Sequence, residues 1–425
     1  MITKDAELIV SKMAEGLVGS EIIKLAGEVK AKIAAGEQIA NLTIGDFNPS
    51  LFPIPNQLKE HIVGAYEEGL TNYPMANGMT ELRETVSNYI SSRQQLNYSP
   101  DEFLISGGAR PLIYATYQAL VDPEDVVLFP VPSWNNNHYT HLSRGRAVFI
   151  ETQAEDNFMP TVSDLEPYIS DATLIAVCSP LNPTGTVFTR EQLEAICDLI
   201  LEENSRRGPD QKPVYLLYDQ IYWSLTFGET VHVDPVSIRP EMRNYTVFID
   251  GISKAYSATG VRLGWGFGPE KVINKMKSIL SHVGAWAPKA EQIGTARFLS
   301  DTHAVDRHLR EIRNKIEFRL NGFYSAFEDL KNSGHPIEAI PPQAAMYLTV
   351  RFSLKGKKTM DGQLLETTED VTRYLLNEAK LAIVPFYAFG TKRDSDWYRL
   401  SVGTAAEEDI ERVRFNLEGA LAKLS

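Results

Sequence analysis

The chain has 425 residues, a formal net charge of −13 and 43% hydrophobic residues, which is typical of a folded globular protein. This composition excludes a disordered, collagen-like or disulfide-rich chain, and an acidic chain without a run of Lys or Arg argues against a nucleic-acid partner. At this length we expect a large domain and a smaller one packed against it.

The N-terminal stretch MITKDAELIVSKMAEG carries charges throughout and lacks the apolar core of a secretory signal. No apolar run approaches the ~20 residues that a membrane-spanning helix needs, so we expect no membrane partner. Cys178 and Cys197 fall in a predicted strand and a predicted helix, which indicates two buried, reduced thiols. These features together predict a cytoplasmic protein.

A proline-rich loop is expected at residues 45–55, GDFNPSLFPIP. Between about residues 103 and 267, short apolar, β-branched runs then alternate with helical stretches. This alternation predicts an α/β domain with a mainly parallel sheet that is flanked by helices on both faces. The seven strand candidates are EFLIS, DVVLFP, AVFIET, TLIAVCS, VYLLYD, TVFID and RLGWGF.

Helix signals support this pattern. Thr189 and Gln192 have the spacing of a capping box, and Pro111 would lie in the first turn of a helix. Residues 300–333 predict one long helix. The tail from about residue 335 predicts a smaller α+β domain, because it mixes the strand-like runs AAMYLTVRF and WYRLSVG with helical ones, the last at 406–424.

Residues able to bind or react follow five of the predicted strands. In open parallel sheets, ligands bind beyond the carboxyl ends of the strands, so these residues are expected to share one cleft. They are the GGAR segment 107–110, Trp134, Asn182, Asp219 with Tyr222, and Lys254.

Their motifs resemble those of the pyridoxal-phosphate-dependent aminotransferases of the aspartate aminotransferase superfamily, fold type I, class I/II. The resemblance covers nearly the whole chain. It implies a fold-type-I homodimer with a seven-stranded sheet, an N-terminal arm and part of the small domain at 1–55, a large cofactor-binding domain at 56–325 and a small domain at 326–425. It rests on PSW 132–134, NPTG 182–185, DQIY 219–222, SKAYSATGVRLG 253–264 and RLSVG 399–403.

The resemblance also implies roles around the cofactor ring. Lys254 would form the Schiff base and move the substrate α-proton, and burial and a nearby cation would lower its pKa for that task. Asp219 would keep the pyridine nitrogen protonated. Tyr222 and Asn182 would hydrogen-bond the ring hydroxylate, and Trp134 would stack on the ring.

For the phosphate, the resemblance implies backbone N–H groups at a helix start together with a fixed cation. Arg262 would be the cation, and a hydroxyl would come from Ser253 or Ser257. Tyr73 would reach the phosphate of the neighbouring subunit. Gly107, Ala109 and Gly251 stand where the family often has hydroxyls, so the backbone at Gly107, Gly108 and Ala109 would carry more of the binding.

For the substrate, Arg399 resembles the arginine that forks the α-carboxylate, with Asn182 and the backbone of Gly45 beside it. Phe386 and Ala344 stand where the family tends to have glycine, at positions expected to approach the substrate. The side chain of the substrate remains open. A second carboxylate would need a cation such as Arg110, Arg144 or Arg351, whereas Tyr387 and Trp286 would equally suit an apolar or aromatic group.

The resemblance implies an enzyme that moves an amino group from an amino acid to a 2-oxo acid, through a Lys254 aldimine and pyridoxamine phosphate. Two alternatives stay open: a pyridoxal-phosphate lyase that eliminates or decarboxylates, and a sensing module that binds the cofactor without turnover. No metal site is expected, because His138 and His141 have no third ligand nearby.

Overall fold

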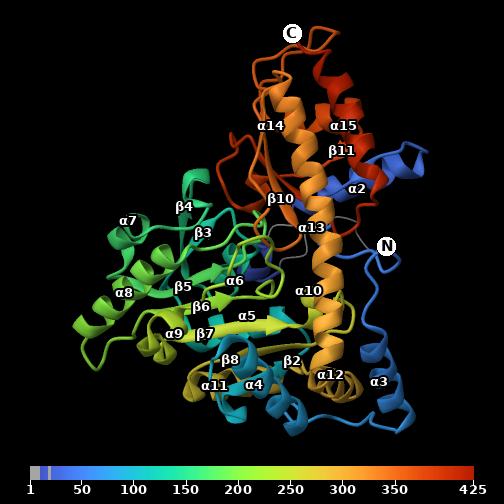
Figure 1. Ribbon diagram of the computed structural model, residues 1–425. Coiled ribbons are helices and arrows are strands. Elements are labelled where there is room, and N and C mark those ends of the chain that lie inside the picture. Colours follow the sequence, from blue (N-terminus) through green and yellow to red (C-terminus); the bar gives the residue numbers. More distant parts are fainter. Residues whose placement is uncertain (1–9, 18–20) are drawn as a thin grey trace, which may run out of the picture.

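The computed structural model describes residues 10–17 and 21–425. At its centre is a seven-stranded sheet with the order β2-β8-β7-β6-β5-β3-β4 (Figure 1). Each strand overlaps one of the seven apolar runs of the sequence, which confirms that prediction. The strands are β2 (Phe103–Ser106), β3 (Val126–Val131), β4 (Arg146–Glu151), β5 (Ala172–Cys178), β6 (Tyr215–Asp219), β7 (Thr246–Gly251) and β8 (Gly264–Phe267).

The sheet is mainly parallel, as the sequence predicts. Strands β7, β6, β5, β3 and β4 pair in parallel, and only β8 runs antiparallel to its neighbours β7 and β2. The carboxyl ends of the other six strands therefore meet at one edge, where the predicted site residues follow them.

Both faces of this sheet are buried. In β5, Ile175 and Val177 belong to one hydrophobic cluster, whereas Leu174 and Ala176 belong to another on the opposite face. This alternation explains why the strands read as continuous apolar runs. The first cluster includes residues of α4 (Thr80–Gln94) and α8 (Arg190–Arg206), and the second those of α5 (Ala109–Leu120) and α11 (Glu270–Val283).

The helix signals of the sequence are confirmed. The Thr189 N–H donates to Gln192 Oε1 at 3.0 Å, and the Gln192 N–H donates to Thr189 Oγ1 at 3.2 Å, so a capping box begins α8. The other helices around the large sheet are α3 (Asn56–Glu67), α6 (Asn136–Leu142), α7 (Val162–Leu165), α9 (Pro235–Ile238), α10 (Ile252–Ala255) and α12 (Lys289–Ser300). Short 3-10 turns occur at η1 (Pro100–Glu102), η2 (Ala154–Asp156), η3 (Glu166–Tyr168), η4 (Pro240–Asn244) and η5 (Phe386–Phe389).

A smaller α+β part packs beside the sheet. Its antiparallel sheet has the order β12-β13-β10-β9, and the N-terminal strand β1 pairs in parallel with β11. Its strands are β1 (Ala40–Asn41), β9 (Ile337–Ala339), β10 (Tyr347–Phe352), β11 (Leu381–Ala382), β12 (Val384–Pro385) and β13 (Trp397–Ser401). Its helices are α2 (Glu21–Ala34), α14 (Thr368–Glu378) and α15 (Glu408–Leu421).

One long helix, α13 (Thr302–Asn332), joins the two parts and runs along the molecule in Figure 1. Its first turns carry Val305 and Leu309 into the core of the large sheet, and its later turns carry Ile316 to Leu330 into the core of the smaller part. The predicted helix at 300–333 is therefore confirmed, and it links the two cores.

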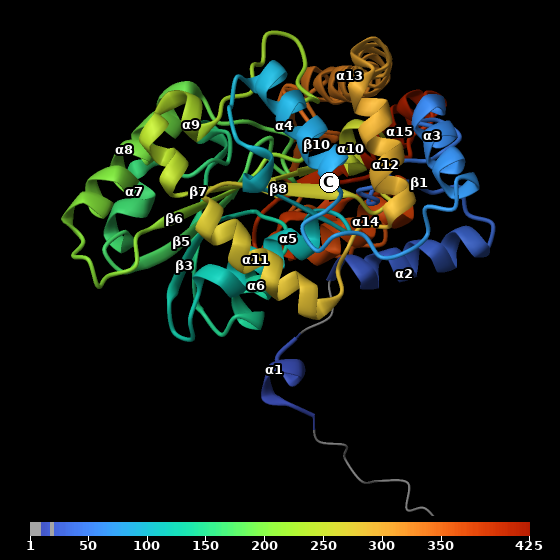
Figure 2. The ribbon, with the colours of Figure 1, turned by 90° about the horizontal axis from the view of Figure 1, so that it is seen from below.

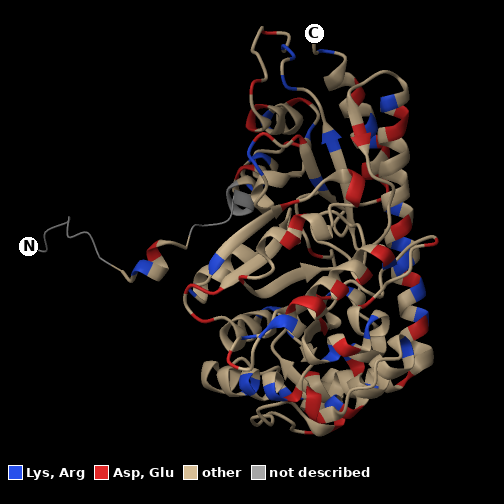
Figure 3. Ribbon diagram, turned by 90° about the vertical axis from the view of Figure 1, so that its left-hand side faces the viewer, with Lys and Arg blue, Asp and Glu red and all other residues tan. Residues whose placement is uncertain are grey.

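Helix α1 (Lys12–Glu15) and most of the charged residues lie at the surface of the molecule. Helix α1 lies apart from the body in Figure 2, although Nε2 of His141 in α6 is 2.7 Å from the Met13 carbonyl oxygen. Figure 3 shows acidic and basic residues intermixed over the chain. Within residues 10–17 and 21–425, no helix is both long and apolar enough to cross a membrane.

Candidate active site

The residues predicted to react lie at the carboxyl edge of the large sheet. Asp219 ends β6, and Lys254 lies in α10, which follows directly after the neighbouring strand β7. Because β6 and β7 pair in parallel, the sheet brings the carboxyl group and the amine to the same side.

The Lys254 amine is half-buried and forms no ion pair with any residue that the structure describes. Its Nζ donates to the Gly45 carbonyl oxygen at 2.7 Å and lies 5.9 Å from the centre of the Tyr222 ring. Burial lowers the pKa of Lys254 to about 8, although the negative charge of Asp46 opposes this change. Three nearby arginines lower the pKa further, namely Arg399, Arg110 and Arg262.

The Asp219 carboxylate is half-buried and also forms no ion pair with any described residue. Its Oδ1 accepts the Ile221 N–H at 3.1 Å. Burial raises the pKa of Asp219 to about 6, while the Ile221 N–H and the charge of Lys254 act in the opposite direction. A charged N–H group of a ligand beside this carboxylate would stabilise its ionised form.

The predicted phosphate-binding residues converge at the start of α5. Arg262 Nη2 donates to the Gly107 carbonyl oxygen at 3.0 Å, and Nη1 donates to the Thr259 carbonyl oxygen at 2.6 Å. Gly108 is the N-cap of α5 and provides no side-chain cap, so the first N–H groups of the helix stay available to an anion. Gly108 has φ +102°, and a Cβ built there would overlap the Arg262 guanidinium.

Arg399, in β13, is a buried cation that has no carboxylate partner within residues 10–17 and 21–425. It is 2% exposed, and its Nη1 donates to Asn182 Oδ1 at 3.1 Å, while Nη2 donates to the Thr43 carbonyl oxygen at 2.6 Å. Its Nε has no partner among the described residues. A buried guanidinium with a free donor is suited to a carboxylate ligand, and the structure brings it to Asn182 and Gly45, as expected.

Two aromatic side chains, Trp134 and Phe389, lie beside the arginines of the site. Trp134 is half-buried, and its ring centre lies 5.4 Å from the guanidinium carbon of Arg110. The ring centre of Phe389, in η5, is 6.2 Å from that of Trp134. Phe389 also lies 4.9 Å from the guanidinium carbon of Arg399. Arg110 forms no ion pair among the described residues, whereas Arg351 is paired with Asp396 and Glu338.

Sequence reasoning missed Tyr347, which begins β10. Its hydroxyl is 2.7 Å from that of Tyr222, and its ring centre is 4.8 Å from the guanidinium carbon of Arg399. It also missed Asp46, Thr43 and Phe389. The only signal for Tyr347 is its place within the predicted strand run AAMYLTVRF, and a strand signal alone does not indicate which distant strand it pairs with.

Some predicted residues lie outside this cluster. Tyr73 is 83% exposed and makes an edge contact with Trp286, at 5.4 Å between ring centres. These two side chains line an open groove of about 670 Å³. Ser253 is buried beside Lys254, whereas Ser257 lines a separate cavity of about 120 Å³ with His308, so only Ser253 stays a candidate for the hydroxyl.

The expectation for Phe386 and Ala344 is wrong. Phe386 has no exposed surface and packs against Phe158 and Phe389. Ala344 is also fully buried, and its N–H donates to the Gly185 carbonyl oxygen at 2.9 Å. Neither side chain is exposed to solvent, so the side chains that stand in place of glycine at these two positions contribute to core packing.

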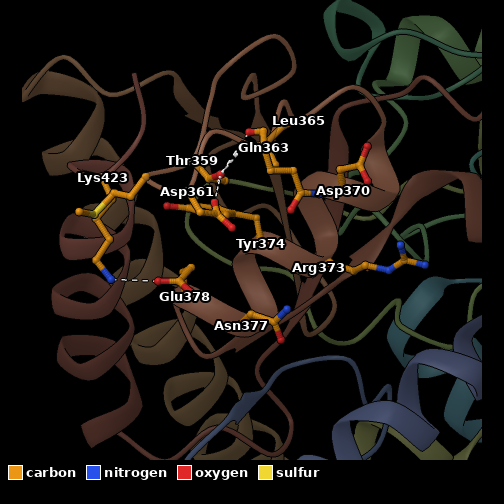
Figure 4. A pocket seen from close by; sticks show the side chains of 11 residues that line it. Thr359, Asp361, Gln363, Leu365, Asp370, Arg373, Tyr374, Asn377, Glu378 and Lys423 are labelled. Atoms are coloured by element: carbon orange, nitrogen blue, oxygen red, sulfur yellow. Dashed lines mark hydrogen bonds and ion pairs between the residues drawn. The ribbon is translucent and has the colours of Figure 1, made fainter.

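A second pocket, of about 450 Å³, lies between α14, the hairpin at 358–364 and the chain end (Figure 4). Several of its charged groups have partners: Lys423 pairs with Glu378, Asp361 accepts the Thr359 hydroxyl, and Asp370 accepts the Thr367 N–H at the start of α14. None of the predicted site residues lies there. No group of three metal-binding side chains occurs in the part of the chain that is described.

The cleft residues fit pyridoxal phosphate. The unpaired Asp219 carboxylate suits the ring N–H, the Arg262 guanidinium and the start of α5 suit the phosphate, and the Lys254 amine of lowered pKa suits the aldehyde. The free donor of Arg399 suits the carboxylate of an amino acid.

Comparisons with known proteins agree with this fit. A family model described as "Aminotransferase class I and II" matches residues 37–414. The aspartate aminotransferase of Bacillus subtilis (strain 168) is 28% identical over 411 residues, which cover 95% of this chain and 98% of the relative. The probable aspartate/prephenate aminotransferase of Rickettsia felis is 30% identical over 394 residues, which cover 92% of this chain and 91% of the relative.

Solved structures show the same fold. The aspartate aminotransferase from Rhizobium meliloti superposes with a TM-score of 0.87 at 24% identity, over 98% of this chain and 100% of that one. The Thermus thermophilus aspartate aminotransferase with maleate superposes with a TM-score of 0.85 at 25% identity, over 97% of this chain and 100% of that one. The fold class predicted from the sequence is therefore confirmed.

Lys254 should titrate near pH 8 in the cofactor-free protein, and Asp46→Asn should lower this midpoint by roughly 0.5 to 1 unit. The midpoint falls because the negative charge of Asp46 stabilises the ammonium form of Lys254, and the Asn side chain lacks this charge. The midpoint is measured from the rate of Lys254 modification by an amine reagent at each pH, followed by mass spectrometry. Asp361→Asn, in the distant hairpin, should leave the midpoint unchanged. A midpoint near 10, or equal effects of the two variants, would contradict this account.

Gly108→Ala should weaken the binding of pyridoxal 5′-phosphate by about 10- to 100-fold, because the new Cβ displaces Arg262 and removes a charged hydrogen bond. Gly107→Ala is the matched control, since its Cβ would lie 3.4 Å from the carbonyl oxygens of Ala285 and Trp286, an ordinary contact. The affinities are measured by titration of the cofactor-free proteins. Similar losses in both variants would argue against the assigned role of Arg262.

Proposed function

Because the chain belongs to the class I and II aminotransferase family, we propose that Lys254 binds pyridoxal 5′-phosphate and that the cleft transfers amino groups between dicarboxylic amino acids and 2-oxo acids. The protein is an aminotransferase that depends on pyridoxal phosphate. The observation that carries the assignment of the site is the Lys254 amine, which is half-buried at the carboxyl end of β7, has a pKa of about 8 and forms no ion pair in the described part of the chain.

Lys254 has two tasks in this proposal. Pyridoxal phosphate supplies an aldehyde that bonds to amines and a ring that withdraws electrons from the substrate α-carbon. The Lys254 amine holds the aldehyde and, when a substrate amine takes its place, accepts the proton of the α-carbon and later returns it. A pKa of about 8 leaves enough of the amine unprotonated near neutral pH for this work.

Four residues hold the ring. Asp219 keeps a proton on the ring nitrogen, because its carboxylate has no cationic partner among the described residues and the positively charged ring N–H provides one. Tyr222 and Asn182 donate hydrogen bonds to the ring oxygen, and Trp134 packs against the ring face. The phosphate is held by Arg262, by the backbone at Gly107, Gly108 and Ala109, and by the Ser253 hydroxyl.

Two cations bind the substrate. Arg399 forks the α-carboxylate with its free Nε and with donors that now bond Asn182 and Thr43, while the backbone of Gly45 lies beside it. Arg110 binds the second carboxylate, since it is exposed above Trp134, has no ion-pair partner among the described residues and contributes to the field at Lys254. The names of the relatives, aspartate and aspartate/prephenate aminotransferases, support acidic substrates.

The active unit in this proposal is a homodimer. Tyr73 is 83% exposed in the single chain, and its groove adjoins the phosphate site through Ala285, whose carbonyl oxygen accepts the Gly107 N–H at 2.9 Å. A second copy that covers this groove would bring Tyr73 to the phosphate of its partner. Sedimentation of the purified chain as a monomer at micromolar concentration would contradict this.

The proposed location is the cytoplasm. Cys178 and Cys197 are both free thiols, and burial raises the pKa of each, which keeps them protonated and unreactive. Recovery of the protein from a compartment other than the cytoplasm after cell fractionation would contradict this location.

Borohydride reduction of the cofactor-loaded protein should attach the cofactor to Lys254, as read from the mass of its peptide. In a separate assay, the unreduced loaded protein should convert aspartate to oxaloacetate in the presence of 2-oxoglutarate, and Lys254→Ala should lower this rate by about 10³-fold or more, because the proton acceptor is lost. Lys331→Ala, a surface control, should keep both the label and the activity. A label on another residue, or no label, would exclude the assigned site.

Arg110→Gln should lower kcat/KM for aspartate by about 10- to 100-fold, the effect of losing one hydrogen bond between charged groups, and should change kcat/KM for alanine by less than about twofold. Arg351→Gln provides the control, since that arginine is already paired. The values come from steady-state kinetics with each amino donor. Equal losses for aspartate and alanine would show that Arg110 does not select the second carboxylate.

A further inference from the structure

We propose that Tyr347 is a positioning residue of this site: its hydroxyl polarises the hydroxyl of Tyr222, and its ring supports the guanidinium of Arg399. The inference rests on the proposed function, because it concerns how strongly Tyr222 binds the cofactor ring. It adds a residue of the smaller α+β part to a ring site otherwise built by the large sheet.

The first argument is the hydrogen bond between the two tyrosines. The hydroxyl oxygens are 2.7 Å apart, and the rings meet edge to face with 5.6 Å between their centres. Tyr222 is 2% exposed and Tyr347 is 1% exposed. Neither hydroxyl has another hydrogen bond among the described residues, so each depends on the other for its only polar contact.

The second argument is the register of the small sheet. Thr349 in β10 lies opposite Arg399 in β13, and Tyr347 lies opposite Ser401, so Tyr347 and Arg399 are diagonal neighbours on one face. The guanidinium carbon of Arg399 is 4.8 Å from the Tyr347 ring centre. One ring therefore contacts the cation that binds the substrate carboxylate and, through its hydroxyl, the tyrosine that binds the cofactor.

The third argument fixes the direction of the hydrogen bond in the loaded enzyme. A phenol has a single proton, and Tyr222 gives its own to the ring oxygen of the cofactor. The proton between the two tyrosines then belongs to Tyr347, which donates to the Tyr222 oxygen. Hydrogen bonds in such a chain polarise one another, so Tyr347 strengthens the donation of Tyr222 and favours the anionic form of the ring oxygen.

Tyr347→Phe removes only this hydroxyl. In the loaded enzyme, the pH midpoint at which the visible absorbance band of the bound cofactor changes should rise by roughly 0.3 unit or more, because the anionic oxygen is less stabilised. Tyr222→Phe should raise the midpoint further, and adding Tyr347→Phe to that variant should have no additional effect. A residue that served only core packing would not move this midpoint.

Tyr398→Phe is the matched control. Tyr398 is a buried neighbour of Arg399 in β13, but its hydroxyl donates to the Thr368 carbonyl oxygen at 3.3 Å, away from the tyrosine pair. It should lose a similar buried hydrogen bond, show a similar change in melting temperature and leave the midpoint unchanged.

The outcomes separate this inference from the proposed function. A wild-type protein that binds no cofactor at Lys254 would overturn both. A loaded enzyme in which Tyr222→Phe moves the midpoint but Tyr347→Phe does not would overturn only the inference. So would effects of Tyr222→Phe and Tyr347→Phe that simply add in the double variant.

Discussion

The site depends on charged groups that are buried without an opposite charge in contact. Lys254, Asp219 and Arg399 are held by backbone carbonyls, a backbone N–H and one side-chain amide, and none of them forms an ion pair with another described residue. Burying unpaired charges is unfavourable, and the two hydrophobic cores must offset it. The same arrangement makes the site selective, because the ring N–H and aldehyde of the cofactor suit Asp219 and Lys254, and the carboxylate of an amino acid suits Arg399.

Much of this arrangement follows from local sequence. Lys254 and Asp219 follow apolar runs that are buried on both faces, and a parallel sheet necessarily gathers such residues at one edge. The Thr189 cap and the helix at 300–333 are also local features. Tyr347, Thr43 and Phe389 were out of reach, because their roles depend on the register of β10 with β13 and on contacts between segments far apart in the chain.

The error at Phe386 has a physical cause as well. A large residue at a position where glycine is usual predicts a change beside the substrate, but the Phe386 ring instead fills the core between Phe158 and Phe389. The motif residues also left a lyase open, since the same lysine and aspartate serve both reactions. The similarity to aspartate and aspartate/prephenate aminotransferases over nearly the whole chain favours amino-group transfer.

Helix α13 has 31 residues, which corresponds to about 47 Å of continuous helix. Its two ends are embedded in different cores, so α13 connects them by continuous helix and contains no loop at which the chain could bend. A rotation of the smaller part would therefore have to occur where α13 leaves the large core, between Leu309 and Ile312. Small rotations then carry Arg399 and Tyr347 together, so the substrate clamp and the support of Tyr222 move as one body.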